Sequence, residues 1–503
     1  MSLSRLWARG WQTALVVLVC LAGFGVRLVD LYDPPLDFHP TRQLRSAILA
    51  RSVYYQLAPD ADSQQREAAQ ALAELETYEP PILETLVGGV YALLGKEALW
   101  AARVMNALFW LIGGAALLQI LRGAVPFWAS WLGLLFYLCL PFGVIASRSF
   151  QPEPWMVMWM LLATWGLRRW QAAPNQWRWA LITGGLMGMA LLVKVVAGFF
   201  LLPALAAVIL ASGLGKMLKR PQTWALAALS AAPVLILYLG FNAQRSGDFL
   251  SFWTVALSGL VLTTNFYADW LAMVKGLTGL AYLPAALLGT VLAGREHKPL
   301  LIGWWAGYAL YGLLFPYQYT THEYYHLPLV ALIGLSLPFL AAPVVERLKQ
   351  EAWIWRLAAL GVVLAAAGYA LFVARSTLVA KNYPYEPESW RRVGEAIPPG
   401  SSVVALTADY GMRLRYYGWR SIAASWPAGA DLKLFSMAGS EAGDPLEAFA
   451  SLTEGRQYFL VTAFSELDAQ PELKQILTEH YPVFAEGNGF VLYDLQNPRP
   501  ETK

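Results

Sequence analysis

The sequence has little charge and almost no cysteine. Charged residues make up 14% of its 503 residues, whereas a soluble globular chain carries about 25%. Hydrophobic residues make up 57% of the chain and the mean hydropathy is +0.43, so an ordinary soluble protein is excluded. The net charge of +3 is too small to suggest a nucleic-acid partner. Both cysteines, Cys20 and Cys139, lie in apolar runs, so no stabilising disulfide outside a membrane is expected.

Long apolar runs are what the chain has instead. A membrane-spanning α-helix needs about 20 mostly apolar residues to cross about 30 Å of hydrocarbon. The runs that meet or approach this length predict about eleven transmembrane helices, near 11–30, 98–121, 125–146, 153–167, 179–193, 195–213, 222–241, 271–293, 299–315, 327–343 and 353–373. The first run follows basic residues as a signal peptide does, but no small-residue cleavage site follows it, so a retained anchor is expected.

Basic residues predict the orientation of these helices. Short loops rich in Lys and Arg stay on the cytoplasmic side, and the basic loops alternate with acidic or aromatic ones if the N-terminus is cytoplasmic. Basic clusters flank both ends of 180–213, so this segment is expected to cross twice and to turn at Lys194. The apolar stretch 249–264 is placed as an outside interfacial segment. The chain is thus predicted to be a multi-pass protein of the inner (plasma) membrane.

Charged residues become frequent again after residue 377. Residues 1–377 form the predicted membrane domain, and 31–97 its first extracytoplasmic loop, with helical patterns over 42–57 and 63–77. An extended turn is expected at Tyr78–Pro81. Residues 378–503 alternate helix signals (386–396, 445–452, 465–480) with strand signals (402–406, 457–462, 490–495), which predicts an extracytoplasmic α/β domain. We find neither a nucleotide-binding fingerprint nor a catalytic constellation in that domain.

Ionisable side chains gather in the loops predicted to lie outside the cytoplasm. The short turn 147–154 carries Arg148 and Glu153 at membrane level, where ionisable groups are costly and usually face a cavity or a partner. An ion pair between these two residues that pins a helical hairpin explains them equally well. Lys194 and Arg103, near the same predicted surface, favour a functional site.

Snorkelling to lipid headgroups is the alternative explanation for each cation, above all for Arg45 and Arg51. A shared cavity that holds cations and carboxylates would instead suit an anionic lipid-linked substrate and leave a carboxylate for acid–base chemistry. The cations in question are Arg42, Arg45, Arg103, Arg148 and Lys194, and the carboxylates are Asp37, Glu79 and Glu153.

The segment His322-Glu323-Tyr324-Tyr325-His326 matches the zinc-protease pattern H-E-x-x-H, in which two histidines one helical turn apart bind the metal. That spacing requires an α-helix. Pro328 disfavours helical geometry at the residue before it, so a loop that enters the next helix is favoured. No third ligand is evident among His39, His297 and His480. An intramembrane zinc metalloprotease is therefore the less favoured alternative.

Taken in order, these segments resemble the GT-C superfamily of membrane glycosyltransferases. The resemblance is to its glycosyltransferase family 39-like branch, similar to protein O-mannosyltransferases and to the aminoarabinose transferase of lipid A. It extends over residues 1–345, and no single piece is diagnostic. The matching segments are 34–43, 79–82, 100–103, 147–153, 185–194 and 322–328.

The resemblance implies a polyprenyl-phosphate sugar as donor and a protein, lipid or glycan acceptor, and it implies inversion at the anomeric carbon. An acidic residue of the first loop would act as general base. Many members carry an Asp-Glu pair there, but here Asp37 is followed by Phe38 and His39, which leaves the base between Asp37 and His39, with Asp37 preferred. Glu153 matches a second acidic position that orients the acceptor or binds a divalent cation; such a cation is possible, and no other cofactor is implied.

The remaining predicted roles follow from the same resemblance. The donor phosphate is expected to bind Arg42, Arg103, Arg148 and Lys194, and other substrate contacts are expected from Glu79, His322, Glu323, Tyr325 and His326. The C-terminal domain would be a structural lid or would help to hold the acceptor. A transporter or flippase for a polar lipid is the alternative function, but it predicts an inverted repeat and charges at mid-membrane, whereas the charges here cluster at one face.

Overall fold

A computed structural model describes residues 3–75, 79–241, 251–439 and 444–500. The chain divides into two compact units, here called the helical unit and the mixed unit. The helical unit consists of Met1–Leu31, Thr77–Pro80 and Trp100–Lys381. The mixed unit consists of Tyr32–Glu76, Pro81–Leu99 and Asn382–Lys503. Most of the first loop and the C-terminal region therefore fold together, although the helical unit separates them in sequence.

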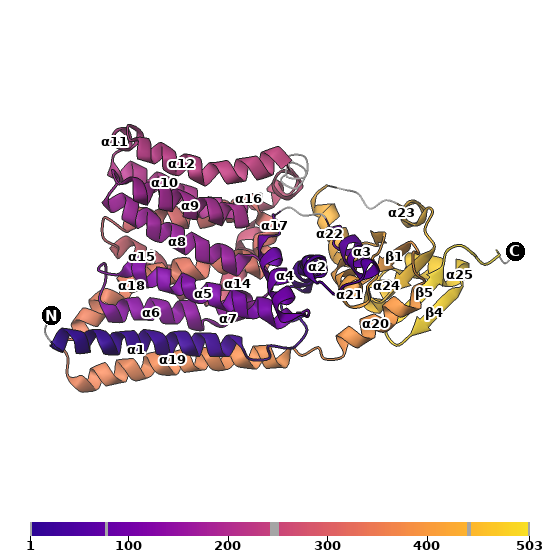
Figure 1. The fold of residues 1–503 in the computed structure, drawn as a ribbon, viewed down its shortest axis with the longest axis horizontal. Coiled ribbons are helices and arrows are strands. Elements are labelled where there is room, and N and C mark those ends of the chain that lie inside the picture. Colours follow the sequence, from indigo (N-terminus) through magenta and orange to yellow (C-terminus); the bar gives the residue numbers. More distant parts are fainter. Residues whose placement is uncertain (1–2, 76–78, 242–250, 440–443, 501–503) are drawn as a thin grey trace. The chain divides into compact units, whose positions relative to one another are not determined.

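Apolar α-helices that lie side by side build the helical unit (Figure 1). Six described helices of this unit have proline in their first turn, where the missing N–H donor costs nothing. The first elements are α1 (Leu3–Arg27), α5 (Leu99–Leu121), α6 (Phe127–Cys139), α7 (Pro141–Arg148), α8 (Glu153–Ala172), α9 (Trp177–Val193), η1 (Val195–Ala197), α10 (Gly198–Ser212), α11 (Leu214–Leu218) and α12 (Pro221–Val234). The later elements are η2 (Leu235–Phe241), η3 (Ser251–Ala256), η4 (Ser258–Leu262), α14 (Thr264–Thr278), α15 (Tyr282–Leu292), α16 (Lys298–Leu314), α17 (Pro316–Thr321), η5 (Glu323–His326), α18 (Leu327–Leu348) and α19 (Trp353–Ala380).

The predicted count of eleven transmembrane helices is not confirmed. Five helices in the described residues are long and apolar enough to cross a membrane, or up to seven if each of two bent pairs is one span. Each bent pair, α6 with α7 (57°) and α14 with α15 (87°), is interrupted by a break. Other predicted spans fall on shorter helices such as α9. The predicted turn at Lys194 is confirmed, because α9 ends at Val193 and Lys194 is extended.

Other predictions for the loops are met only in part. In the stretch 249–264, the short helical turns η3 and η4 precede the start of α14. Residues 249 and 250 lie outside the described residues. The helix expected over 63–77 ends at Leu72 as α3 (Ser63–Leu72). Tyr78 of the expected extended turn is also outside the described part of the chain.

Two glycines on α16 allow α10 to approach closely. Gly303 and Gly307 are four residues apart, so they lie on one face of the helix. A Cβ added at Gly303 would lie 2.3 Å from the Cα of Ala204, and one at Gly307 would lie 2.1 Å from the carbonyl oxygen of Phe199. Small residues at this spacing are a usual means of close packing between helices in a membrane.

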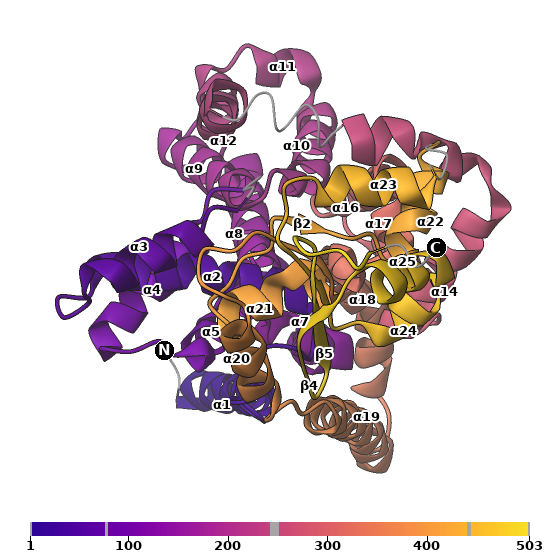
Figure 2. The same cartoon turned by 90° about the vertical axis from the view of Figure 1, so that its right-hand side faces the viewer.

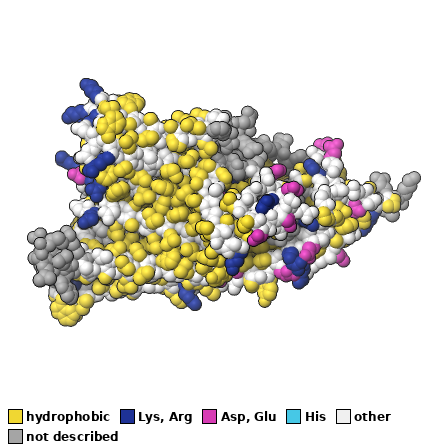
Figure 3. Space-filling view, in the orientation of Figure 1, with side chains coloured by type: hydrophobic (Ala, Val, Ile, Leu, Met, Phe, Trp, Pro, Cys, Tyr) yellow, Lys and Arg dark blue, Asp and Glu magenta, His cyan; other side chains and the backbone are white. Residues whose placement is uncertain are grey.

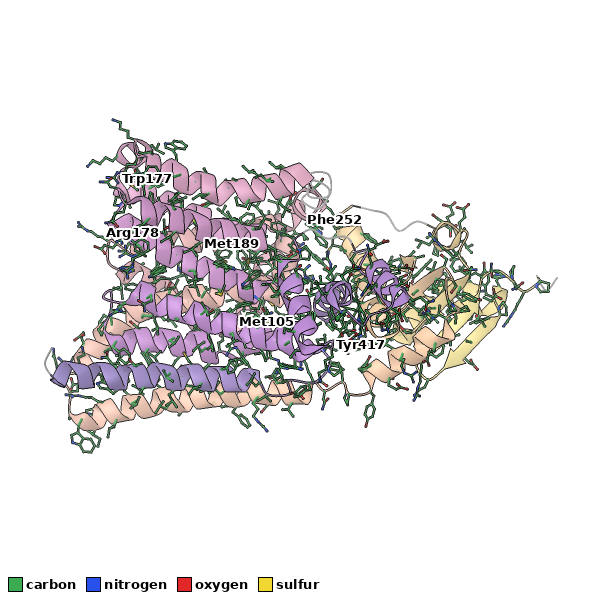
Figure 4. All side chains as sticks on the ribbon, in the orientation of Figure 1. Met105, Trp177, Arg178, Met189, Phe252 and Tyr417 are labelled. Atoms are coloured by element: carbon green, nitrogen blue, oxygen red, sulfur yellow. The ribbon has the colours of Figure 1, made fainter. Side chains whose placement is uncertain are left out.

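The surface of the helical unit separates apolar from basic side chains. Apolar side chains cover the flank of the helices, and Lys and Arg gather at the end where α11 lies (Figure 3). Arg178, near the start of α9, points outward at this end (Figure 4). A basic end of this kind is what the positive-inside rule expects on the cytoplasmic side, although the orientation itself stays a prediction.

The mixed unit contains a five-stranded sheet of order β2-β1-β3-β5-β4, which confirms a sheet in the C-terminal region (Figure 2). β1 pairs in parallel with β2 and β3, while β5 is antiparallel to both β3 and β4. The three predicted strand segments correspond to β1, β3 and β5. The strands are β1 (Val403–Leu406), β2 (Ala424–Ser425), β3 (Tyr458–Val461), β4 (Val483–Gly487) and β5 (Phe490–Asp494).

Helices cover both faces of this sheet. Val403 of β1 belongs to a core cluster with Leu414 of α21, whereas its neighbour Val404 belongs to a second cluster with Leu467 of α24. This alternation follows from the two-residue period of a strand. The first face is covered by α20 (Glu386–Ala396) and α21 (Met412–Tyr417), and the second by α23 (Pro445–Thr453), α24 (Phe464–Asp468) and α25 (Pro471–His480). The connection from β2 to β3 also contains α22 (Gly429–Met437).

The first-loop helices α2 (Pro40–Leu57) and α4 (Ile82–Leu94) belong to the same unit, and Arg51 of α2 links them to the C-terminal region. Its guanidinium lies 3.8 Å from the ring centroid of Tyr416 and 4.4 Å from that of Trp419, and it pairs with Glu97 at 2.9 Å. Burial lowers the pKa of Arg51, but Tyr416 and Glu97 outweigh it and the net shift is upward. Arg51 is 5% exposed, so the snorkelling interpretation is wrong for this residue.

Candidate functional site

Lys194 is the centre of a buried charged cluster in the helical unit. The residue occupies the break between α9 and η1, and its side chain is 7% exposed. Its ammonium forms an ion pair with Glu153, and its Nζ lies 3.4 Å from Oε1 of Glu79. Glu153 is the first residue of α8, where the helix dipole favours a carboxylate. Three of the predicted site residues are therefore in contact, one cation with two carboxylates.

Two aromatic rings lie beside the same ammonium. Lys194 Nζ is 5.5 Å from the ring centroid of Tyr324 and 5.6 Å from that of Tyr325. These distances are within the range in which a ring quadrupole attracts a cation. Tyr325 was a predicted substrate contact, whereas Tyr324 was not predicted. The only sequence signal for Tyr324 is its place inside the His322–His326 segment.

The histidines of that segment do not form the protease arrangement. Glu323–His326 is a 3-10 turn that leads directly into α18, as the proline after it predicts, and not an α-helix. His326 is fully buried, with Nδ1 2.7 Å from the Tyr308 hydroxyl and Nε2 2.9 Å from the Tyr319 carbonyl. Both ring nitrogens are thus used inside the protein. His322 Nδ1 lies 2.7 Å from the hydroxyl of Thr321.

Metal ligands are not grouped elsewhere in the described part of the chain. No set of three or more His, Cys, Asp or Glu side chains there is arranged to hold a metal ion. The metalloprotease alternative therefore gains no support from the His322–His326 segment or from any other described group.

Arg103 and Arg148 hold the end of α1. Arg148 donates to the carbonyl of Asp30 at 2.9 Å and also to that of Val29, and Arg103 donates to the carbonyls of Asp30 and Leu31 at 3.2 and 3.0 Å. Asp30 lies in the turn that follows α1 and has a left-handed backbone (φ 53°). Cationic side chains favourably meet the carbonyls of a helix C-terminus. Both arginines are fully buried, and these contacts give them a positioning role beside the predicted phosphate role.

Asn106 shapes the turn that leads to Glu153, and sequence analysis missed it. Its buried amide donates to the carbonyls of Ser149 and Gln151 at 2.5 and 3.1 Å. The Gln151 side chain is fully buried, and neither of its amide atoms has a hydrogen-bond partner among the described residues. A buried polar residue of this kind normally needs a partner. The sequence signal for Asn106 was its position as an asparagine inside the otherwise apolar helix α5.

Asp37, the preferred base, belongs to the mixed unit and is 8% exposed. The side-chain amide of Gln43 donates to Asp37 Oδ1 at 3.3 Å and to the Phe38 carbonyl at 2.6 Å. His39 has a left-handed backbone (φ 46°) immediately before Pro40 starts α2. The amide of Gln43 therefore fixes the segment that carries Asp37. Arg42, the fourth predicted phosphate ligand, lies on α2 in the same unit.

Comparison with known proteins gives both a family match and matching structures. Residues 78–239 match the family model described as dolichyl-phosphate-mannose-protein mannosyltransferase. ArnT from Cupriavidus metallidurans bound to undecaprenyl phosphate is similar with a TM-score of 0.59 and 16% identity over 97% of this chain and 98% of that chain. The apo form of that protein gives a TM-score of 0.60, again with 16% identity and the same coverage.

The oligosaccharyltransferase of Archaeoglobus fulgidus in its apo form is a further similar structure. Its TM-score is 0.55 with 12% identity, over 90% of this chain and 69% of that chain. The resemblance to the GT-C superfamily is confirmed. At these identities, the solved structures show that the GT-C fold is shared. No curated protein sequence matches the chain.

The family match covers the charged cluster of the GT-C fold. Residues 78–239 include Glu79, Glu153 and Lys194 together with Arg103 and Arg148. They do not include the segment around Asp37, the His322–His326 segment or the C-terminal region. The part of the chain that the family model matches therefore supplies Lys194 and both carboxylates of the cluster.

Proposed function

We propose that the protein is an inverting glycosyltransferase that moves a sugar from a polyprenyl-phosphate donor to an acceptor hydroxyl on the extracytoplasmic face of the membrane. The observation that carries the proposal is the Lys194 cluster, in which a buried ammonium contacts two carboxylates and two tyrosine rings. The family match over the same residues supports a polyprenyl-linked donor, as does a similar structure with bound undecaprenyl phosphate.

The donor phosphate is proposed to bind at Lys194. An ammonium group carries three N–H donors, so a phosphate oxygen can share it with the carboxylates. Glu79 is the easier of the two carboxylates to displace. Its side chain is 20% exposed and its Oε1 lies 3.4 Å from Lys194 Nζ, whereas the side chain of Glu153 is only 3% exposed. Charge that develops on the departing phosphate is stabilised by a preorganised cation in a site with little water. Arg103 and Arg148 are proposed to keep the surrounding backbone in place and to add positive potential.

Asp37 is proposed as the general base. It removes the proton from the acceptor hydroxyl while the oxygen attacks the anomeric carbon from the side opposite the phosphate. The C–O bond to the phosphate breaks in the same step, and the polyprenyl phosphate leaves. The amide of Gln43 holds the carboxylate in one orientation, which supports a role as an oriented base. Asp37 is preferred over His39, whose ring stacks edge-on against Phe38.

The proposal is tested by the release of free undecaprenyl phosphate from a panel of undecaprenyl-phosphate sugars supplied with membrane extract as acceptor. Wild type is expected to release the lipid phosphate with at least one sugar. Asp37→Asn is expected to lower turnover by about 10²–10⁴-fold, the usual contribution of a general base, and to bind undecaprenyl phosphate as wild type does. Asp60→Asn, an exposed aspartate of the same unit, is the matched control.

The same assay separates the transferase from the lipid transporter. A transporter moves its cargo without breaking the sugar–phosphate bond, so it releases no free undecaprenyl phosphate. Wild-type turnover in Asp37→Asn would overturn the assignment of the base. Absence of lipid phosphate release with every sugar, despite bound lipid, would overturn the transferase.

A further inference from the structure

The sheet of the mixed unit has a topological switch point between β1 and β3. The chain leaves β1 for α21 on one face and leaves β3 for α24 on the other. Thr407 and Thr462 directly follow the two strands, and the Thr462 hydroxyl donates to that of Thr407 at 2.7 Å. In open α/β sheets, ligands bind outside the carboxyl ends of the strands at such a point.

The backbone after β1 is strained at this edge. Asp409 (φ 57°) and Tyr410 (φ 53°) are both left-handed, and Gly411 (φ 73°) continues the same conformation. Residues other than glycine adopt this conformation as single residues, and not in succession. Residues strained in this way occur mainly at binding and catalytic sites. The Asp409 carboxylate pairs with Arg413, which helps to hold the turn.

Two exposed aromatic side chains follow these strands, Tyr410 in the turn after β1 and Phe464 at the first position of α24. Tyr410 follows β1 and is 53% exposed, and Phe464 follows β3 and is 39% exposed. The hydroxyl of Tyr410 donates to Asp431 at 2.8 Å, which fixes the orientation of its ring. The edge thus combines apolar ring faces with hydroxyl and carboxylate groups.

The strained turn also touches the segment that carries the proposed base. The hydroxyl of Thr41, in the first turn of α2, lies 3.5 Å from Asp409 Oδ1. Asp37 is four residues before Thr41, and Gln43 of the same helix holds its carboxylate. All of these residues belong to the mixed unit. A ligand bound at the carboxyl edge of β1 and β3 would therefore touch a turn that is bonded to the base-bearing segment.

We propose that this edge binds a sugar ring of the acceptor, so that the acceptor of the proposed transferase is a glycan or a glycolipid. A sugar has an apolar C–H face that an aromatic ring can cover and a rim of hydroxyls that Thr and Asp side chains can bind. A peptide acceptor would instead seek a row of unpaired N–H and C=O groups along an edge strand, which the carboxyl ends of strands do not present. The inference rests on the proposed function, because it names the acceptor of that reaction.

The test uses saturation-transfer NMR on the full-length protein in detergent. The probes are chitobiose, maltotriose and a Ser/Thr-rich peptide of twelve residues, and binding of undecaprenyl phosphate is measured on the same samples. The main variant is Tyr410→Gly, because glycine keeps the left-handed backbone and removes only the side chain. Tyr410→Phe keeps the ring. Phe484→Ala is the control, because Phe484 is an exposed ring near the start of β4 that packs on Tyr458 at the opposite, amino end of β3.

Wild type, Tyr410→Phe and the Phe484 control are expected to bind at least one oligosaccharide equally well. Tyr410→Gly is expected to weaken that binding at least tenfold, with an unchanged or higher melting temperature and unchanged binding of undecaprenyl phosphate. Equal oligosaccharide binding by Tyr410→Gly and wild type would overturn the proposal, as would binding of the peptide alone or of no probe. If wild type binds no undecaprenyl phosphate, the result counts against the proposed function instead. Failure of the acceptor proposal and failure of the proposed function are therefore distinguishable.

Discussion

Replacement of Lys194 by methionine separates a structural from a functional role of the buried cluster. Met has nearly the same length as Lys but no charge, so it leaves Glu153 and Glu79 without the cation between them. Removal of one partner from a buried ion pair costs about 3–5 kcal/mol, and the Lys194 and Glu153 side chains are only 7% and 3% exposed. At about 2 °C per kcal/mol, the value for large domains, the melting temperature should fall by about 6–10 °C.

The double variant Lys194→Met with Glu153→Leu is the decisive comparison. An apolar pair of similar volume often replaces a buried ion pair without loss of stability, so most of the fall in melting temperature should be recovered. Undecaprenyl phosphate binding and turnover should stay at the level of the single variant, because both variants lack the ammonium that is proposed to bind the phosphate. Lys349→Met is the matched control, because Lys349 is 53% exposed in its pair with Glu346 and such a surface pair contributes at most about 1 kcal/mol.

Two results would refute this reasoning. A single variant that melts within about 2 °C of wild type would mean that the ion pair contributes no more than a surface pair does. A double variant that regains turnover along with stability would mean that Lys194 is a structural pin, and the donor phosphate would need another ligand. Thermal melting in detergent and lipid binding by native mass spectrometry supply both measurements.

Two further predictions concern packing. Arg51→Met should destabilise the mixed unit by about 1–3 kcal/mol, because Glu97, whose side chain is 21% exposed, loses its cation and the stacking on Tyr416 is lost. Arg51→Lys should recover only part of this, because an ammonium lacks the flat guanidinium that stacks on rings. Protease cleavage of the first loop measures both effects. Gly307→Ala should lower the melting temperature because its Cβ would meet the backbone of Phe199, whereas Gly185→Ala should not, because that Cβ would meet nothing within 4 Å. Equal melting of the two glycine variants would contradict the close contact between α10 and α16.

Local patterns in the sequence were enough to predict much of the fold. The helix break at Lys194 followed from length and flanking charge, and the strands β1, β3 and β5 followed from short runs of β-branched and aromatic residues. β2 has only two residues, and the strand pattern of β4 is weak because most of its side chains are exposed. Neither strand has the buried apolar run by which a strand is recognised in a sequence.

Only part of the candidate site could be predicted in the same way. Lys194 and Glu153 stood out because a charge in an apolar environment is costly, and the structure pairs them. The role of Arg51 could not be predicted, since its partners Tyr416 and Trp419 are distant in sequence and carry no local signal. For the same reason, the left-handed turn at Asp409 has no signature in a sequence that offers only one glycine there.

The contacts of Arg51 with Tyr416 and Trp419 have a consequence for biogenesis. Tyr416 lies 365 residues after Arg51 in the sequence, so the ribosome adds α2 long before that partner. The early loop must therefore wait, without these neighbours, until the C-terminal region has been synthesised. Contacts between such distant segments form slowly, so a polypeptide that stalls before the C-terminal region would leave Asp37, the proposed base, on an unfinished scaffold.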